Sequence, residues 1–295
     1  MLDVIRRRID LPDRGVEISL LDWGGTGPLA LLHHANGFCA GMWGPVAAVL
    51  RERFHVIGMD ARGHGDSSNP EDLDHYRWEN FGRDLGVVAE ALVAEHSGER
   101  VSLGLGHSFG GTAMLMASAA RTGLFERLLL LDPIVMPPIE MITDARLEHG
   151  RNLADGARKR RIVWPDRDEV RAKWKDKETF TGWDPRAFEL YLEEGFRDRE
   201  DGQVELKCSG DVEAAIFESG RRFDTMALAP GVASPALILW AARGNFPRGL
   251  YEMLGDRLVD ARVRDADTGH FVPMEDPALV VEEAFAFSAR RDGRG

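Results

Sequence analysis

One serine in the sequence stands where it could act as a nucleophile. The motif Gly106-His107-Ser108-Phe109-Gly110 follows the apolar run 101–105 and precedes the helical run 112–121. A G-x-S-x-G motif between a strand and a helix indicates a sharp turn that exposes the serine hydroxyl. The start of the helix also directs the positive end of its dipole at a developing oxyanion. We therefore expect Ser108 to attack an acyl carbon.

A serine hydroxyl needs a base within hydrogen-bond reach and a third group that holds this base in the right tautomer. Nine histidines are available, and His270 is the best candidate because Gly269-His270 follows a late predicted strand, from where it can reach a nucleophile at a strand end. His107 lies inside the serine motif and is expected to point away. We expect His33, His34 and His64 to order loops, and find no chemical context for the other four.

The elements that must position these residues read as alternating strands and helices. Short apolar runs bounded by Gly, Pro, Asn and Asp suit strands covered on both faces, as in a parallel sheet. Apolar residues at three- and four-residue spacing over 78–92, and from Pro277 to Phe287, predict helices packed against that sheet. The fold class is therefore α/β. The predicted strands are 16–21, 29–33, 55–59, 101–105, 128–131, 235–240 and around 258–263.

The pattern changes between residues 138 and 230, where the strand signal fades and aromatic residues stand at irregular spacing among charged ones. Such a segment suggests several short helices lying over an apolar surface. We predict an inserted helical cap at 138–230, and a discontinuous core made of residues 1–137 and 231–295.

Four further segments resemble those of the α/β-hydrolase fold, and the resemblance extends over nearly the whole chain. They are the loop His33-His34-Ala35-Asn36-Gly37-Phe38, the turn Asp60-Ala61-Arg62-Gly63-His64-Gly65-Asp66-Ser67, the stretch Thr268-Gly269-His270-Phe271, and the insertion between the sixth and seventh strands. The resemblance implies a mostly parallel eight-stranded sheet with helices on both faces. It also implies an oxyanion hole built from the backbone N–H groups of Phe38, after Gly37, and Phe109, after the nucleophile.

The third member of the triad departs from the commonest arrangement of that family. The family's acid usually follows the seventh strand, but residues 239–246 contain no carboxylate. Asp132 directly follows the predicted strand 128–131, which corresponds to the sixth of the family's eight strands; some relatives carry the acid there, and we expect Asp132 to take this role. Asn245, Asp265 and Asp267 remain alternatives.

Composition excludes several classes of function. The 295 residues are 44% hydrophobic and 29% charged, with a net charge of −12, which is typical of a soluble globular protein and argues against nucleic-acid binding. No membrane span or secretory signal is recognised, so we expect a cytoplasmic protein with reduced Cys39 and Cys208. No metal-ligand spacing, P-loop or dinucleotide fingerprint is present, and we predict no cofactor. The expected partner is a small-molecule substrate, and the oligomeric state cannot be read.

These observations predict a serine hydrolase of a small, mainly apolar carboxylic ester or lactone. The same triad would serve a hydrolase of activated carbon–carbon bonds or an acyltransferase, and a ligand-binding protein that has lost its chemistry is a further alternative. The basic run 158–161 could attract a carboxylate, but we interpret it as a solvated surface. The residues expected to line the pocket are His34, Asn36, Met136, Trp164 and Trp183.

Overall fold

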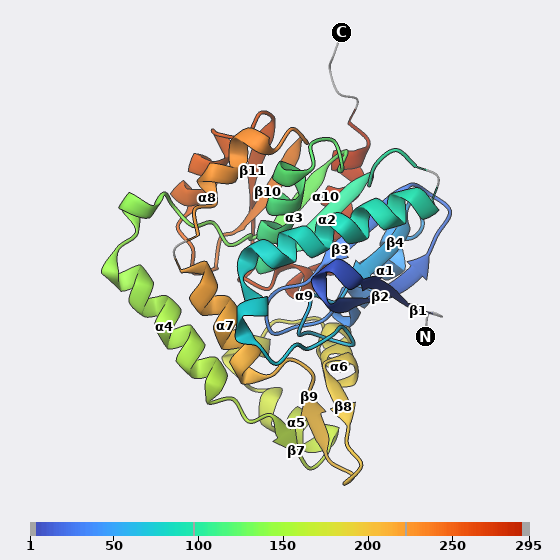
Figure 1. The fold of residues 1–295 in the computed structure, drawn as a ribbon, viewed down its shortest axis with the longest axis vertical. Helices are drawn as coiled ribbons and strands as arrows, with labels where there is room; N and C mark the ends of the chain where they lie inside the picture. The colour runs from blue at the N-terminus through green and yellow to red at the C-terminus, as the bar shows by residue number, and fades with distance from the viewer. Residues whose placement is uncertain (1–3, 97, 222, 291–295) are drawn as a thin grey trace.

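The computed structural model describes residues 4–96, 98–221 and 223–290. Within these residues, eight strands form the main sheet in the order β1-β2-β4-β3-β5-β6-β10-β11 (Figure 1). β1 and β2 pair antiparallel, as do β2 and β4, and the other neighbours are parallel. The predicted α/β fold class, with a mostly parallel eight-stranded sheet, is confirmed. The strands are β1 Ile5–Leu11, β2 Val16–Gly24, β3 Leu29–His33, β4 His55–Met59, β5 Leu103–His107, β6 Leu128–Leu131, β10 Ala236–Ala241 and β11 Ala261–Ala266.

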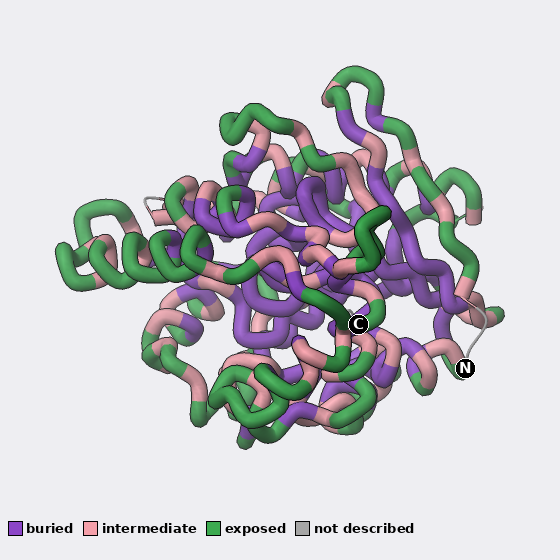
Figure 2. Tube along the Cα trace, turned by 90° about the horizontal axis from the view of Figure 1, so that it is seen from below, coloured by how far each residue is buried: buried purple, intermediate pink, exposed green. Residues whose placement is uncertain are grey.

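Helices cover both faces of this sheet because its central strands are mostly apolar and are buried on both faces. In β6, Leu128 and Leu130 join one buried cluster while Leu129 and Leu131 join another, as alternation along a strand requires. Helices α2, α3 and α8 contribute to the first cluster, and α1 and α10 to the second. Figure 2 shows the buried residues gathered in the middle of the molecule. These helices are α1 Gly44–Leu50, α2 Trp78–Glu95, α3 Phe109–Ala120, α8 Arg248–Gly255 and α10 Pro277–Ser288, and the short α9 Val272–Glu275 precedes α10.

The sheet edges differ most from the sequence prediction. β1 is missed because its three consecutive arginines, 6–8, hide the alternation, and most of its residues are exposed. β2 is antiparallel to both neighbours, not part of the parallel sheet. β11 lies three residues later than expected, since this edge strand carries exposed charged residues and not an apolar run. Edge strands need no second buried face, so hydrophobicity marks them poorly.

The segment between β6 and β10 holds four helices and, in its described residues, a small antiparallel sheet of order β7-β9-β8. β6 and β10 are paired neighbours, so both ends of the segment meet at one place on the main sheet. The small sheet is not predicted, because strands of two or three residues carry too little periodicity. Its elements are α4 Asp144–Arg158, β7 Val163–Trp164, α5 Arg167–Trp174, α6 Pro185–Glu194, β8 Phe196–Asp198, β9 Val204–Leu206 and α7 Gly210–Gly220.

Residues of α5, α6 and the small sheet form an aromatic-rich cluster that also includes Cys39, Met42 and Met274 of the core side. Trp174 lies at its centre, with ring centroids 5.3 Å from Phe180, 5.8 Å from Tyr191 and 5.6 Å from Phe196. These elements lie together at the bottom of Figure 1, away from α2 and α3. Among the described residues, no helix is both long enough and apolar enough to cross a membrane.

Candidate active site

Ser108 occupies a strained turn at the carboxyl end of β5. Its backbone angles, φ 56° and ψ −122°, lie where non-glycine residues are rare. The turn is possible because a Cβ at position 110 would lie only 2.4 Å from the carbonyl oxygen of His33, so Gly110 allows α3 to start against β3. The serine side chain therefore stands at the start of α3, at the edge of the sheet where the parallel strands end.

His270 bridges Ser108 and Asp132, although the three residues lie far apart in the sequence. Its Nε2 is 2.9 Å from Ser108 Oγ, and its Nδ1 is 2.6 Å from Asp132 Oδ2. Asp132 is fully buried, and its Oδ1 accepts a hydrogen bond of 3.0 Å from the Ala241 N–H at the end of β10. An ionised Asp132 places the proton of the neutral imidazole on Nδ1 and leaves Nε2 as the acceptor for the serine proton.

The other candidate acids lie away from His270. Asp265 pairs with Arg248 at 2.9 Å, and the side chain of Asp267, 95% exposed, pairs with Arg243 at 3.3 Å. Neither has a hydrogen bond to the imidazole within the described residues, and the same holds for Asn245. In this structure Asp132 alone of the four candidates contacts the histidine.

His107, beside the nucleophile, is turned away from the hydroxyl. Its Nε2 donates to the carbonyl oxygen of His270 at 2.8 Å. Burial, with a smaller contribution from His270, lowers the pKa of His107 to about 3. A neutral His107 thus fixes the backbone of His270, as expected for a residue that does not react.

The loop between β3 and η2 (Ala40–Trp43) does not present the N–H of Phe38 as expected. That group donates to the carbonyl oxygen of Ala35 at 3.2 Å, and the N–H of Gly37 donates to His64 Nε2 at 3.0 Å. Asn36 and Phe109 have no acceptor for their N–H groups among the described residues. The Phe38 prediction is at odds with this geometry, because Phe38 closes a turn.

A signal for this turn was present in the sequence. Asn36-Gly37 is a common pair at the centre of a β-turn, and Gly37 has φ +82°, which a type II turn requires at its third position. In such a turn the fourth residue donates to the first, so the N–H of Phe38 is consumed. Within the described residues, the free N–H of this loop is therefore that of Asn36, two residues before Phe38.

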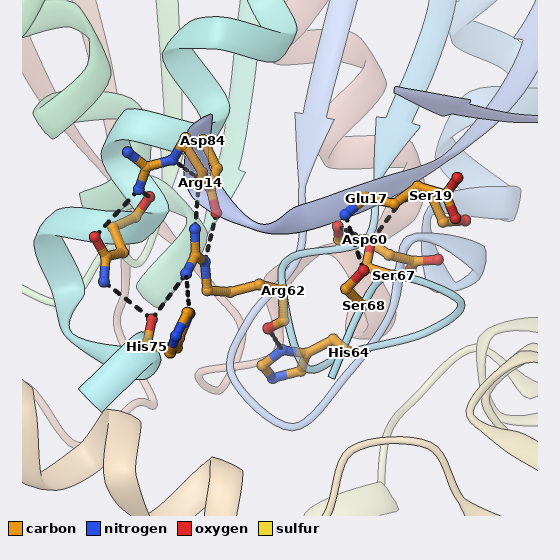
Figure 3. Close-up of polar contacts among 11 residues, drawn as sticks. Arg14, Glu17, Ser19, Asp60, Arg62, His64, Ser67, Ser68, His75 and Asp84 are labelled. Atoms are coloured by element: carbon orange, nitrogen blue, oxygen red, sulfur yellow. Dashed lines mark hydrogen bonds and ion pairs between the residues drawn. The ribbon is translucent and has the colours of Figure 1, made fainter. Parts of the chain in front are cut away.

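Hydrogen bonds with the glycine-rich turn 60–67 support this loop. Asp60 accepts the N–H of Ala40 at 2.7 Å, and Arg62 makes a buried two-bond ion pair with Asp84 at 2.6 and 2.7 Å. Figure 3 shows how this pair, His64 and Ser67 tie the turn together. His64 Nδ1 donates to the carbonyl oxygen of Arg62 at 3.0 Å, which leaves its Nε2 to accept from the loop. His64 thus has the structural role that the sequence suggested.

Two of the predicted pocket residues hold the loop with their side chains. Both ring nitrogens of the buried His34 are used: Nδ1 donates to the Ala35 carbonyl at 2.7 Å, and Nε2 accepts from the Ala61 N–H at 2.9 Å. Burial first, and then neighbouring histidines, lower the pKa of His34 well below its usual range. The Asn36 side chain donates to the carbonyl oxygen of Glu213 at 3.0 Å.

The other three predicted pocket residues, Met136, Trp164 and Trp183, lie at separate places in the segment between β6 and β10. Met136 is buried beside the loop after β6, and its backbone N–H donates to Thr225 at 3.0 Å. Trp164 packs on Trp174 at 5.9 Å, inside the aromatic cluster. Of the five residues, only Trp183 has ring contacts both with Phe38, on the loop after β3, and with Phe271, next to His270.

Those ring contacts form an aromatic wall that the sequence did not reveal as a unit. Phe38 lies 5.8 Å from Trp183, 5.0 Å from Tyr191 and 5.7 Å from Phe271, which follows the candidate base. The Tyr191 hydroxyl donates to the Gly37 carbonyl at 3.1 Å. Residues of α6 therefore reach the loop that follows β3, but spacing alone could not pair such distant segments.

Comparison with known proteins places this geometry in a family. The sequence profile described as the alpha/beta hydrolase family matches residues 30–283. N-formylmaleamate deformylase of Pseudomonas putida is 28% identical over 268 residues, which cover 89% of each chain. The solved structure of E-2-(acetamidomethylene)succinate hydrolase superposes with a TM-score of 0.79 at 21% identity, covering 97% of this chain and 99% of the other. A thioesterase domain from the curacin biosynthetic pathway gives 0.76 at 15% identity, covering 96% and 99%. The chain belongs to the alpha/beta hydrolase family.

Proposed function

We propose that this hydrolase forms an acyl-enzyme on Ser108, with His270 as general base and Asp132 as the acid that orients it. The observation that carries the proposal is the continuous chain of hydrogen bonds from Ser108 Oγ through both imidazole nitrogens to the buried Asp132 carboxylate. His270 takes the serine proton during attack and returns it to the leaving group. The charge of Asp132 stabilises the imidazolium in between.

The oxyanion of the tetrahedral intermediate needs donors that the resting fold does not use. The N–H of Phe109, at the start of α3, meets this requirement, as the sequence suggested. For the second donor we propose the N–H of Asn36, since Gly37 and Phe38 have spent theirs on His64 and Ala35. The Phe109 N–H directly follows the nucleophile, and the loop that carries Asn36 is held by the side chain of Asn36 on the Glu213 carbonyl.

We propose a small acyl compound as the substrate, either a carboxylic ester or lactone or an acyl–nitrogen compound. The aromatic wall of Phe38, Trp183 and Phe271 suits an apolar portion of such a molecule. Acyl–nitrogen cleavage is the second candidate because the names of two similar proteins, the formylmaleamate deformylase and the acetamidomethylene-succinate hydrolase, denote acylated nitrogen compounds. A Ser-His-Asp triad serves either bond, since the leaving group is protonated by the histidine in both cases.

We further propose that residues 138–230 act as a cap that sets specificity over the core formed by 1–137 and 231–295. Its support is the reach of Trp183 and Tyr191 to Phe38 and Gly37 on the core side. The cap is not helical throughout, because it also contains the small antiparallel sheet of β7, β9 and β8.

Labelling with a fluorophosphonate tests the proposal. We expect one adduct per chain at Ser108 by peptide mass spectrometry, and none in Ser108→Ala. A panel of nitrophenyl esters, lactones and N-acyl compounds would then rank the bond types, with Ser108→Ala reducing kcat by a factor on the order of 10⁶. Absence of an adduct in the native protein would instead support a ligand-binding protein that has lost its chemistry.

A further inference from the structure

The four basic residues 158–161 do not share one environment. Arg158 forms a surface ion pair with Glu218, at 2.9 and 2.8 Å, and Arg161 lies over the ring of Trp164, 4.3 Å from its centroid. Arg160 turns inward instead, and its Nη2 donates to Glu213 Oε1 at 2.9 Å. The interpretation of this run as a solvated surface therefore fits its neighbours but not Arg160.

The Arg160–Glu213 pair lies directly against the loop that carries Asn36. The Glu213 backbone carbonyl accepts the Asn36 side chain, and Glu213 Oε1 would lie 2.9 Å from a Cβ placed on Gly37. The charge of Arg160 is also one of the influences that lower the pKa of His64, after burial and its other neighbours. The guanidinium is thus one side chain away from the proposed oxyanion donor.

This pair leaves a buried donor unused. Arg160 Nη1 is buried and has no hydrogen-bond acceptor within the described residues. Glu213 Oε2 is likewise buried without a donor. An unpaired buried polar atom destabilises the fold, and more so where the group is charged, so such atoms mark places where a ligand would add hydrogen bonds.

We propose that Arg160 binds a carboxylate group of the substrate on the cap side of the oxyanion loop. The inference rests on the proposed function, because it concerns the substrate of that same site. It narrows the substrate class to small acids that carry a cleavable acyl group a few atoms from the carboxylate. The planar guanidinium has donors left for such an anion, and hydrogen bonds between two charged groups are the stronger kind.

A pair of esters that differ in one charge tests this site. The anionic ester is 4-nitrophenyl hemisuccinate, and its neutral counterpart is the methyl ester of the same compound. We expect Arg160→Gln to lower the ratio of kcat/KM for the anionic to the neutral ester on the order of 10- to 100-fold. An unchanged ratio for Arg160→Gln would overturn the proposal.

Arg158→Gln is the matched control, since it removes one charge from the same basic run without touching the loop. It should leave the ratio within about twofold of the native value, because a screened surface charge acts weakly. An equal fall in Arg158→Gln and Arg160→Gln would mean general charge attraction, and would also overturn the proposal.

Direct binding separates this inference from the proposed chemistry. Titration of Ser108→Ala with succinate, followed by calorimetry, needs no turnover. We expect saturable binding that weakens at least tenfold in the Ser108→Ala/Arg160→Gln protein. Succinate binding of this kind with no fluorophosphonate adduct would refute the nucleophile and keep the carboxylate site, whereas an adduct without Arg160-dependent binding would do the reverse.

Removal of Arg160 alone leaves Glu213 buried without its partner, which could prevent folding. The Arg160→Gln/Glu213→Gln variant removes both charges and keeps similar volumes, so it provides the folded comparison. It should lose the preference for the anionic ester as the single variant does. Retention of that preference in the double variant would contradict the proposal.

Discussion

The core and the segment 138–230 hold their sides of the candidate site by different means. On the core side, buried hydrogen bonds fix each loop: Asp132 to Ala241, His107 to His270, and Asp60 to Ala40. In residues 138–230, packed aromatic rings and ion pairs hold the elements together. Many of those ion pairs are exposed, such as Arg171 with Glu189. Buried hydrogen bonds are directional and costly to break, whereas ring packing tolerates small shifts.

This difference suggests a division of labour. We propose that the core fixes the reacting atoms to within a hydrogen-bond length, while residues 138–230 supply contacts that can vary with the substrate. Variants on the core side should therefore change kcat by large factors, while variants on the cap side should act by smaller ones.

The largest expected effect is that of Asp132→Asn. The amide cannot stabilise the imidazolium and favours the wrong tautomer of His270, so we expect kcat to fall by a factor on the order of 10⁴. Steady-state kinetics on the best ester would measure it, with circular dichroism to show that the fold is kept. Asn245→Ala is the matched control and should change kcat by less than about twofold. Comparable losses in the two variants would contradict the assignment of Asp132.

Acid should destabilise the core through its buried histidines. Burial is the main cause that lowers the pKa of His33 and of His64 to about 4 and that of His107 to about 3, against 6.5 in an unfolded chain. Between pH 6.5 and about 4, these histidines bind protons in the unfolded chain but stay neutral in the folded core. Stability is thus complete above pH 6.5 and lost as the pH falls, by up to about 4 kcal/mol per pH unit for three such groups. Asp60, whose pKa is raised by burial, offsets part of this loss.

Urea unfolding at pH 7.5, 6.0 and 5.0 would measure this loss. His149, in α4, is exposed and serves as the control. His149→Gln should leave the pH dependence as it is in the native protein. A free energy of unfolding that stays constant from pH 7.5 to 5.0 would show that the core histidines are not neutral as described.

Gly37→Ala tests how closely the oxyanion loop must be held. The added Cβ would meet Glu213 Oε1 at 2.9 Å, and the φ of +82° is itself strained for alanine. We expect kcat to fall on the order of 10²-fold as the loop shifts, which is about the effect of losing one oxyanion donor. Gly123→Ala separates strain from displacement, because Gly123 has φ +87° but nothing within 4 Å of its Cβ. That control should lose stability with no change in kcat; equal kcat losses would contradict the role of the loop.

The sequence predicts the interior of this molecule far better than its margins. The runs 29–33, 55–59 and 128–131 match their strands to the residue, because strands buried on both faces form nearly continuous apolar runs. β1 and the small sheet of the cap escape prediction, since they are short or carry exposed charges.

For the candidate site, motif context selects Ser108 and His270, and the resemblance to α/β hydrolases adds Asp132; the structure brings these three side chains together. Asp132 directly follows the predicted strand 128–131, while Ser108 and His270 come shortly after the predicted strands 101–105 and 258–263, and parallel strands end at a common edge. The free N–H of Asn36 and the inward turn of Arg160 could not be predicted in this way. They depend on which hydrogen bonds the loop has already made and on contacts between α4, α7 and the core.

The smallest expected effect is on the cap side, where Tyr191→Phe removes one hydrogen bond to the Gly37 carbonyl. Loss of a buried hydrogen bond costs about 1 kcal/mol, so we expect kcat to fall about fivefold while KM changes little, because the loop and not the substrate is affected. Tyr76→Phe is the matched control. The Tyr76 hydroxyl also donates, to Asn69 Oδ1 at 2.6 Å and to the Pro70 carbonyl oxygen at 2.8 Å. Both variants should lose similar stability by thermal unfolding, but only Tyr191→Phe should lose activity. If both lose activity alike, the cap serves only as a support, and the oxyanion loop is positioned by the core alone.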